Sequence, residues 1–209
     1  MNKSIYRWIF YIVGILILAV GLTLNTKSAL GVSPIISVSY LFSQLTEISF
    51  GDTTFVYYCL FVLVQLIMLR DWQVLFQIPF SIVFTRFLNL FSECIVFEPA
   101  SFMQKIIILI IAIICTGIGA ALTVNMQIVP NPGDGIVNAI AIKTKKEMGL
   151  IKNIFDCCCI CITLVLGFMT SHAFCGIGIG TICAMIGVGR VISLFNHLCK
   201  KTLQSKAGL

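Results

Sequence analysis

An uncharged apolar run of 19 residues, Ile106 to Val124, most strongly limits what this chain can fold into. A helix needs about 20 apolar residues to cross the hydrocarbon core of a bilayer, so this run is long enough to span a membrane. It is followed by Asn125 to Gly135, a segment with two prolines, two glycines, two asparagines and an aspartate. A helix break of that composition beside a membrane span is where we expect a polar site.

The composition indicates that the rest of the chain also lies in lipid. Of the 209 residues, 59% are hydrophobic and 11% are charged, whereas soluble domains average roughly 25% charged residues. Because helices satisfy their own backbone hydrogen bonds in lipid, we expect an all-α polytopic membrane protein with no separate soluble domain. The net charge of +6 is attributed to membrane topology and not to nucleic acid binding.

Eight apolar segments can be drawn along the chain. The second and sixth are too short to provide the roughly 20 apolar residues of a regular span. The first has flanks like those of a signal peptide but no clear small-residue cleavage site, so we expect it to remain as a helix. The predicted segments are residues 5–25, 34–46, 52–69, 74–97, 105–124, 132–143, 152–170 and 176–198.

The two halves of the chain match one another, which predicts a duplication. Leu22–Asn25 matches Leu122–Asn125, and Ser33-Pro34 matches Asn131-Pro132 in the same order. We therefore expect one membrane domain made of two homologous four-segment repeats, residues 1–99 and 100–209. Further matches in the same order are Gly51 with Gly149, Cys59 with Cys157, and Arg86 with Arg190.

The positions of lysine and arginine predict that both termini lie in the cytoplasm. If all eight segments cross the membrane, the external loops hold only Lys27 and Arg70, and the repeats are parallel. If the second and sixth segments are re-entrant, Arg70 moves inside, Lys105 moves outside and the repeats are inverted, as in many transporters. The charge bias is equally strong in both arrangements, so it favours neither.

Asp134 is the best single candidate for a ligand-binding residue. Asn131 and Pro132 start the sixth segment with a helix-start signature, as Ser33 and Pro34 start the second. Asp134 then falls at the third helical position, where the positive helix end favours a carboxylate. It could bind a cation, a proton or a substrate amine, or it could simply cap the helix near the membrane surface.

Two polar stripes recur at helical spacing in the fourth and eighth segments. Arg86, Asn89 and Glu93 lie at i, i+3 and i+7, on one helical face. In the functional interpretation, both stripes line a central cavity, where Arg86 and Arg190 bind an anion or pair with acids. In the alternative, Arg86 pairs with Glu93 or extends to the membrane surface, and the second stripe lies at the membrane edge. That second stripe consists of Arg190, Ser193 and His197.

Four further polar residues are candidates for contact with a ligand. Asn25 and Asn125 end the first segment of each half, and they would coordinate a substrate or satisfy carbonyls at the helix end. Asp156 lies near the start of the seventh span, and we expect it to pair with Lys152 four residues before it. Thr181, at the start of the last span, could face a cavity.

No catalytic, metal or cofactor site is expected. Cys157 and Cys161 share a helical face, but a structural zinc site needs four ligands and no second pair lies nearby. The run Gly176-x-Gly178-x-Gly180 lacks the lysine of a phosphate loop and favours close helix packing through small residues. No Ser-His-Asp or paired-carboxylate arrangement points to an enzyme.

Several short motifs resemble those of a known family. They are Leu30-Gly31-Val-Ser-Pro34 in the first half, and Pro132-Gly-Asp134-Gly135, Gly149, Asp156 and Gly178-Ile-Gly180-Thr181 in the second. On these motifs, over most of its length, the chain resembles the YczE/YyaS/YitT group of bacterial integral membrane proteins, most closely the YczE-like branch. The resemblance implies an inner-membrane protein with two related halves. It carries over no catalytic residue, and Arg190 stands where a small residue or proline is expected.

The leading hypothesis is a small-molecule transporter or permease of the bacterial cytoplasmic membrane. Its site would lie between the two halves, where Asp134, Arg86, Asn25 and Asn125 would orient the ligand. Expected partners are the lipid bilayer, a small-molecule or ion substrate, and either further copies of the chain or a partner membrane protein.

Two alternatives remain open. One is a substrate-binding membrane subunit that needs an energising partner, and it would be favoured by a small-xxx-small docking face, to which Gly14 and Gly21 are a poor match. The other is a membrane assembly or regulatory protein that transports nothing.

Overall fold

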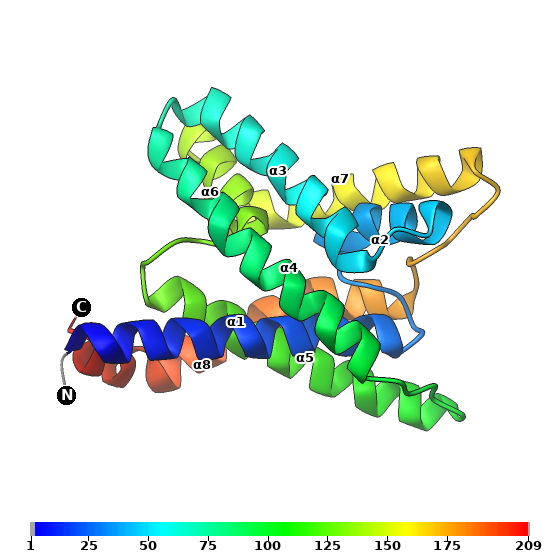
Figure 1. Cartoon of the computed structure of the whole chain (residues 1–209), viewed down its shortest axis with the longest axis horizontal. Coiled ribbons are helices and arrows are strands. Elements are labelled where there is room, and N and C mark those ends of the chain that lie inside the picture. The colour runs from blue at the N-terminus through cyan, green and yellow to red at the C-terminus, as the bar shows by residue number, and fades with distance from the viewer. Residues whose placement is uncertain (1–2, 209) are drawn as a thin grey trace.

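The computed structural model describes residues 3–208 and folds almost entirely into helices (Figure 1). Each predicted segment is helical for most of its length, and the largest difference lies at the C-terminus, where the last helix continues to Ala207. Leu203 and Ala207 pack into the core, so the apolar face of this helix extends into its lysine-rich end. The elements are α1 (Lys3–Lys27), α2 (Pro34–Thr46), α3 (Phe50–Leu69), the 3-10 turn η1 (Trp72–Phe76), α4 (Gln77–Cys94), α5 (Phe102–Asn125), α6 (Pro132–Thr144), α7 (Met148–Met169) and α8 (Ile179–Ala207).

Six helical elements are long and apolar enough to cross a membrane: α1, α3, α4 together with η1, α5, α7 and α8. In contrast, α2 and α6 have 13 residues each. At 1.5 Å per residue this is roughly 20 Å of helix, short of the roughly 30 Å hydrocarbon core. Their starts agree with the predicted signature, because Ser33 and Asn131 are the N-cap residues and Pro34 and Pro132 follow directly.

Helices α1 and α5 run antiparallel and pack against one another with their backbones in close contact (Figure 1). Glycines permit this approach: a Cβ atom added at Gly21 would lie 2.5 Å from the Thr116 backbone nitrogen. One added at Gly119 would lie 2.5 Å from the Leu18 backbone nitrogen, and Gly14 faces α5 in the same interface. Gly14 and Gly21 therefore serve packing inside the chain and are not free for docking a partner.

The helices form two groups, called the scaffold group (α1, α4, α5 and α8) and the short-helix group (α2, α3, α6 and α7). In the scaffold group, α4 packs against α1 and α8 packs against α5. In the short-helix group, α2 packs against α7 and α6 packs against α3. Contacts between α3 and α4 join the groups, and Figure 1 shows α4 crossing between them. Both chain ends lie at the same end of the molecule, where Gly208 lies against the Lys3 side chain.

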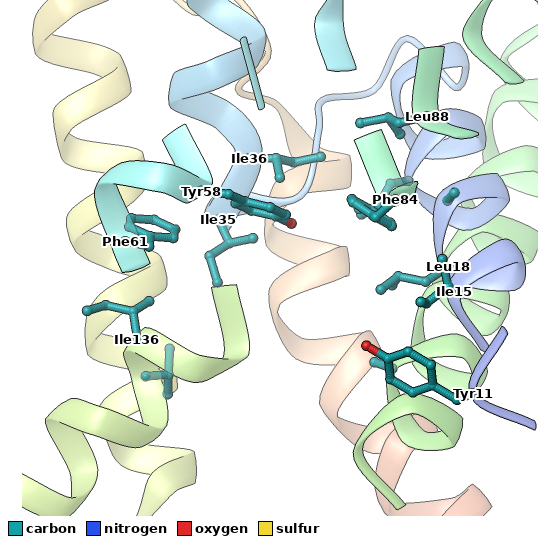
Figure 2. Packing of buried hydrophobic residues seen from close by; sticks show 14 of the residues in the cluster. Tyr11, Ile15, Leu18, Ile35, Ile36, Tyr58, Phe61, Phe84, Leu88 and Ile136 are labelled. Carbon is teal, nitrogen blue, oxygen red and sulfur yellow. The ribbon is translucent and has the colours of Figure 1, made fainter. Parts of the chain in front are cut away.

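Large apolar side chains fill the space between the two groups (Figure 2). Tyr58 of α3 lies beside Ile36 of α2, and its ring stacks on Phe84 of α4 with centroids 6.0 Å apart. On the outside, large apolar residues such as Val56 and Ile67 are exposed. Exposed apolar side chains on the outside are expected for a protein whose helix surfaces are covered by lipid.

The α1–α5 contact yields a stability prediction. We expect Gly119→Ala to lower the free energy of unfolding by about 1–3 kcal/mol, because the added methyl group overlaps the α1 backbone. Gly189→Ala is the matched control, since no atom lies within 4 Å of its Cβ position. It should leave stability unchanged or raise it by up to about 1 kcal/mol through helix propensity. Reversible unfolding of both variants in detergent measures the difference, and equal values would contradict the packing argument.

Candidate ligand cavity between the two helix groups

A cavity of about 50 Å³ lies where the two helix groups meet, and it is called the central cavity below. Both short helices begin at this cavity. Ser33 precedes α2, Asn131 precedes α6, and both line it, while Ile35 in the first turn of α2 packs against Gly133 in the first turn of α6. The first N–H groups of a helix have no partner within it and carry partial positive charge. Two helix starts therefore bring polar groups into the interior.

Charged side chains also line the central cavity. Asp134 reaches it from the first turn of α6, as the sequence predicted for the helix position of this residue, and Lys152 reaches it from α7. The Lys152 Nζ atom lies 3.3 Å from Asp156 Oδ2, which confirms the predicted pair. The Asp156 side chain is only 1% exposed and does not line the cavity itself, so its effect on the cavity comes through its ion pair with Lys152. The cavity thus holds one carboxylate and one ammonium group, with a second carboxylate that fixes the ammonium.

Sequence reasoning missed two residues of the central cavity, Tyr58 and Thr116. Both lie in apolar helices, where an isolated hydroxyl gives little signal. The Thr116 hydroxyl oxygen is buried and has no hydrogen-bond partner within the described part of the chain. The hydroxyl oxygen lies against Gly21 of α1, where an added Cβ atom would be 2.6 Å from it, so it is buried in the α1–α5 contact.

The two predicted asparagines lie outside the central cavity. Asn125 donates from Nδ2 to Oδ1 of Asn196 at 2.7 Å, and this bond joins the end of α5 to α8. Asn25 is buried near the end of α1, and its side-chain oxygen has no hydrogen-bond partner among residues 3–208. Asn125 thus joins two helices, and a ligand contact for either residue stays a prediction.

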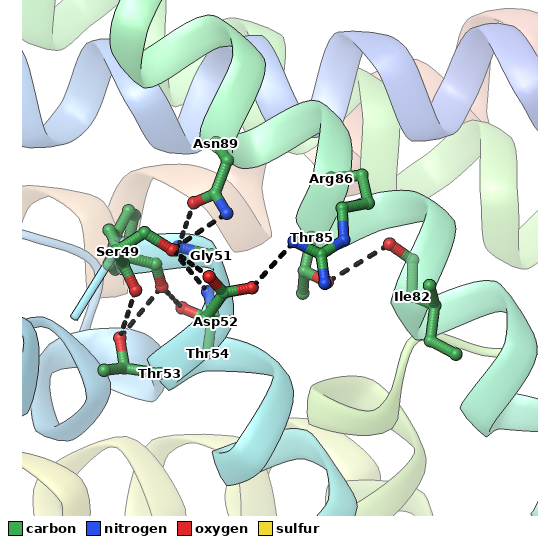
Figure 3. Close-up of polar contacts among 10 residues, drawn as sticks. Ser49, Gly51, Asp52, Thr53, Thr54, Ile82, Thr85, Arg86 and Asn89 are labelled. Atoms are coloured by element: carbon green, nitrogen blue, oxygen red, sulfur yellow. Dashed lines mark hydrogen bonds and ion pairs between the residues drawn. The ribbon is translucent and has the colours of Figure 1, made fainter.

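The stripe on α4 binds the start of α3 and does not line the central cavity (Figure 3). Arg86 Nη1 lies 3.0 Å from Asp52 Oδ1, and Asn89 Oδ1 accepts a hydrogen bond from the Gly51 N–H at 2.6 Å. The partner of Arg86 is therefore Asp52 and not the predicted Glu93. The spacing of residues within one helix could not reveal this pair, because the start of α3 is brought to α4 by tertiary packing.

The second predicted stripe is exposed on the surface of α8: Arg190, Ser193 and His197. Helix α8 contacts Gly117 of α5 through Val188 and Val191, and this packing turns the stripe outward. Asn196, next to the stripe in sequence, points to α5 and accepts the bond from Asn125. Neither stripe lines the central cavity, and a ligand contact for Arg86 stays a prediction.

Thr181 is buried at the start of α8. Its hydroxyl accepts a hydrogen bond from the Gly178 N–H and donates one to the Gly176 carbonyl, both at 3.2 Å. These bonds hold the loop before α8 in place. The hydroxyl is occupied, and Thr181 does not line the central cavity.

A larger cavity, called the vestibule below, lies at the end of the molecule that carries both termini. Its volume is about 610 Å³, within the range of sites for small organic molecules. The side chains of Gln65 and Gln77 line it and bind one another, with Gln77 Nε2 donating to Gln65 Oε1 at 2.9 Å. Aromatic and polar residues complete the lining, among them Trp8, Phe76, Phe80, Asp71 and Asn138.

A narrow space of about 20 Å³ lies between the vestibule and the central cavity. It shares Phe80 and Pro130 with the vestibule, and Leu18 and Asn131 with the central cavity. The three spaces therefore adjoin one another through shared lining residues, in an order that runs from the end with the termini to the starts of α2 and α6.

Comparison with known proteins places the chain in a family. Residues 5–197 match a family described as a family of unknown function, DUF6198. The chain belongs to the DUF6198 family. It is 24% identical over 194 residues to the uncharacterized membrane protein YczE of Bacillus subtilis strain 168, a match that covers 91% of this chain and 86% of that protein. The resemblance to YczE-like proteins is confirmed, and with six candidate spans this DUF6198 chain is a membrane protein. No solved structure matches it.

The ion pair in this DUF6198 protein yields a second prediction. We expect Asp156→Asn to lower the free energy of unfolding by about 3 kcal/mol, because it leaves Lys152 largely buried without its partner. Arg86→Gln breaks the exposed pair with Asp52 and should cost at most about 1 kcal/mol. Unfolding in detergent measures both changes. Adding Lys152→Met to Asp156→Asn should restore part of the loss, and no recovery would contradict the ion-pair explanation.

Proposed function

We propose that this protein is a small-molecule transporter or permease, and not an enzyme, whose substrate binds in the central cavity. The observation that carries the proposal is the presence of Asp134 and Lys152 in a cavity inside the helix bundle, where two short helices begin. Charged groups at membrane depth are costly and usually mark substrate or ion pathways. In many transporters, the starts of discontinuous helices meet at such a site.

The helix contacts support a second part of the proposal, that the halves are inverted repeats and that α2 and α6 are re-entrant. Contacts recur in equivalent pairs: α1–α4 corresponds to α5–α8, and α2–α7 corresponds to α6–α3. The first helices of the two halves, α1 and α5, run antiparallel, as inverted repeats require. The 13-residue lengths of α2 and α6 favour helices that enter the membrane without crossing it.

The distribution of charge supports an orientation with both termini in the cytoplasm. The end opposite the termini carries Lys27 and Lys105. This matches the six-crossing arrangement and makes the vestibule a cytoplasmic opening of a bacterial inner-membrane protein. At the end that carries the termini lie the start of α1 and the ends of α3, α6 and α8, and the basic residues in or next to these helix ends are Lys3, Arg7, Arg70, Lys143, Lys145, Lys146, Lys200, Lys201 and Lys206.

The contacts suggest how a ligand would be held. Asp134 would bind a cationic or hydrogen-donating group, and Lys152, held by Asp156, would bind an acceptor. Of the predicted binding residues, Asp134 contributes directly and Asp156 contributes through Lys152, whereas Arg86 lies elsewhere.

The proposal is tested first by ligand-dependent stability. Purified protein is heated in the presence of a library of metabolites and ions, each well above the expected Kd. A ligand at about 100 times its Kd stabilises the folded state by about 2.7 kcal/mol. We expect at least one such ligand, and we expect Asp134→Asn to abolish its effect. Arg86→Gln is the control, because Arg86 lies outside the cavity, and its ligand response should equal that of the natural chain.

Uptake of the same ligand into proteoliposomes then tests transport itself. The natural chain should take up the ligand, and the Asp134→Asn variant should not, while both remain folded in the membrane. A ligand response that persists in Asp134→Asn would overturn the site. Binding without uptake by the protein alone would instead favour a substrate-binding subunit that needs an energising partner.

A further inference from the structure

We propose that the contact between the α1–α2 loop and the α7–α8 loop is a gate, which opens the central cavity toward the end of the molecule opposite the termini. The contact, called the glycine seam below, consists of residues 30–32 and 176–180. The proposal rests on the proposed transport function and adds how that same site reaches the second side of the membrane.

Two backbone hydrogen bonds join the loops across the glycine seam. The Val32 N–H donates to the Gly176 carbonyl, and the Gly180 N–H donates to the Leu30 carbonyl, both at 2.8 Å. The two loops are far apart in sequence, and each lies between helices of a different half of the chain. The bonds therefore hold the two halves together at this end.

Glycines make the contact close. A Cβ atom at Gly178 would overlap the Leu30 carbonyl oxygen, and one at Gly180 would lie 2.9 Å from the same oxygen. A Cβ atom at Gly31 would lie 2.5 Å from the Thr181 hydroxyl. The run Gly176-x-Gly178-x-Gly180 therefore serves contact between loops, in addition to the helix packing that its composition suggested.

The glycine seam adjoins the central cavity in the chain, because Ser33, which lines that cavity, directly follows Val32. A cavity of about 380 Å³ lies at the seam itself, lined by residues of both loops and by Tyr40. It shares no lining residue with the central cavity, whereas the vestibule is linked to that cavity through the narrow space. On this proposal the seam is closed in this state, and the central cavity is reached from the vestibule.

The equivalent loops at the other end are not joined in this way. The match of Ser33-Pro34 with Asn131-Pro132 pairs Val32 with Pro130, which has no N–H to donate. The α3–α4 connection, residues 70–76, contains no glycine. No backbone hydrogen bond joins these two loops within the described residues, and both line the vestibule.

The chemistry of the glycine seam suits a contact that opens and closes. It consists mainly of backbone against backbone, and its strongest links are two hydrogen bonds. Separating the loops would expose N–H and C=O groups that water can satisfy, and Val32 is the one buried large apolar side chain among residues 30–32 and 176–180. At the vestibule, the exposed side chains of Trp8 and Phe76 could pack together when that end closes.

The test uses two cysteine reporters, one at each end. Cys175 adjoins Gly176 and is partly buried in the closed seam. The second reporter is introduced by Asn138→Cys in the vestibule, where Asn138 is exposed. Protein in lipid nanodiscs, with both faces open to buffer, is treated with a water-soluble maleimide. Peptide mass spectrometry then gives the alkylation rate at each position.

Gly178→Ala should open the glycine seam because the added methyl group overlaps the Leu30 carbonyl oxygen. The backbone at Gly178 is extended, a conformation that any residue can adopt, so the substitution acts through this steric contact alone. We expect alkylation of Cys175 to become at least tenfold faster and alkylation of the vestibule cysteine to become slower. Gly180→Ala, with a milder contact, should change both rates in the same directions by less. Gly149→Ala also lies at a helix start but has no atom within 4 Å of its Cβ position, and it should change neither rate.

Three outcomes decide the proposal. The proposal is supported if alkylation of Cys175 becomes faster while alkylation of the vestibule cysteine becomes slower. The change should be largest in Gly178→Ala, smaller in Gly180→Ala and absent in Gly149→Ala. Faster alkylation at both ends means general loosening and overturns it, and so do unchanged rates in a folded Gly178→Ala variant. If Gly178→Ala does not fold, Gly180→Ala decides by the same criteria. The ligand response that depends on Asp134 is measured separately, so the gate can fail while the transport site stands, and the reverse.

Discussion

Backbone polar groups cannot remain unpaired in lipid, and this constraint shapes the arrangement around α2 and α6. Both helices begin inside the protein, so their first N–H groups must be met by protein, water or ligand. The scaffold group makes this feasible, because the close contact of α1 with α5 places Leu18, Thr116 and their neighbours as a wall behind the two helix starts. The central cavity is the space left between this wall and the short-helix group.

The polar side chains within the bundle divide into those that hold helices together and those that face the cavity. Arg86 with Asp52 ties α4 to α3, and Asn125 with Asn196 ties α5 to α8. Asp134 and Lys152 face the cavity, where nothing in the described part of the chain bonds the Asp134 carboxylate. This division explains why the proposed function depends on Asp134 and not on the more conspicuous arginine.

The sequence predicted the local features of the site well. The helix starts at Pro34 and Pro132, the position of Asp134 in the first turn of α6, and the Lys152–Asp156 pair all follow from rules that act within a few residues. It left the polar stripes open between two interpretations, because helical spacing tells which residues share a face but not which way that face is turned. Tyr58 and Thr116 were missed for the related reason that a lone hydroxyl in an apolar helix is seldom functional.

The sequence by itself determined that the chain lies in a membrane, where most of its helices begin, and which two of them are short. These properties depend on hydrophobicity, proline and capping residues, which act over one or two helical turns. Only the tertiary structure decided that the starts of α2 and α6 meet, that Arg86 turns to Asp52, and that the glycines at 176, 178 and 180 contact the α1–α2 loop. Contacts between distant segments depend on how side chains of several helices fill space together, and no local pattern encodes that.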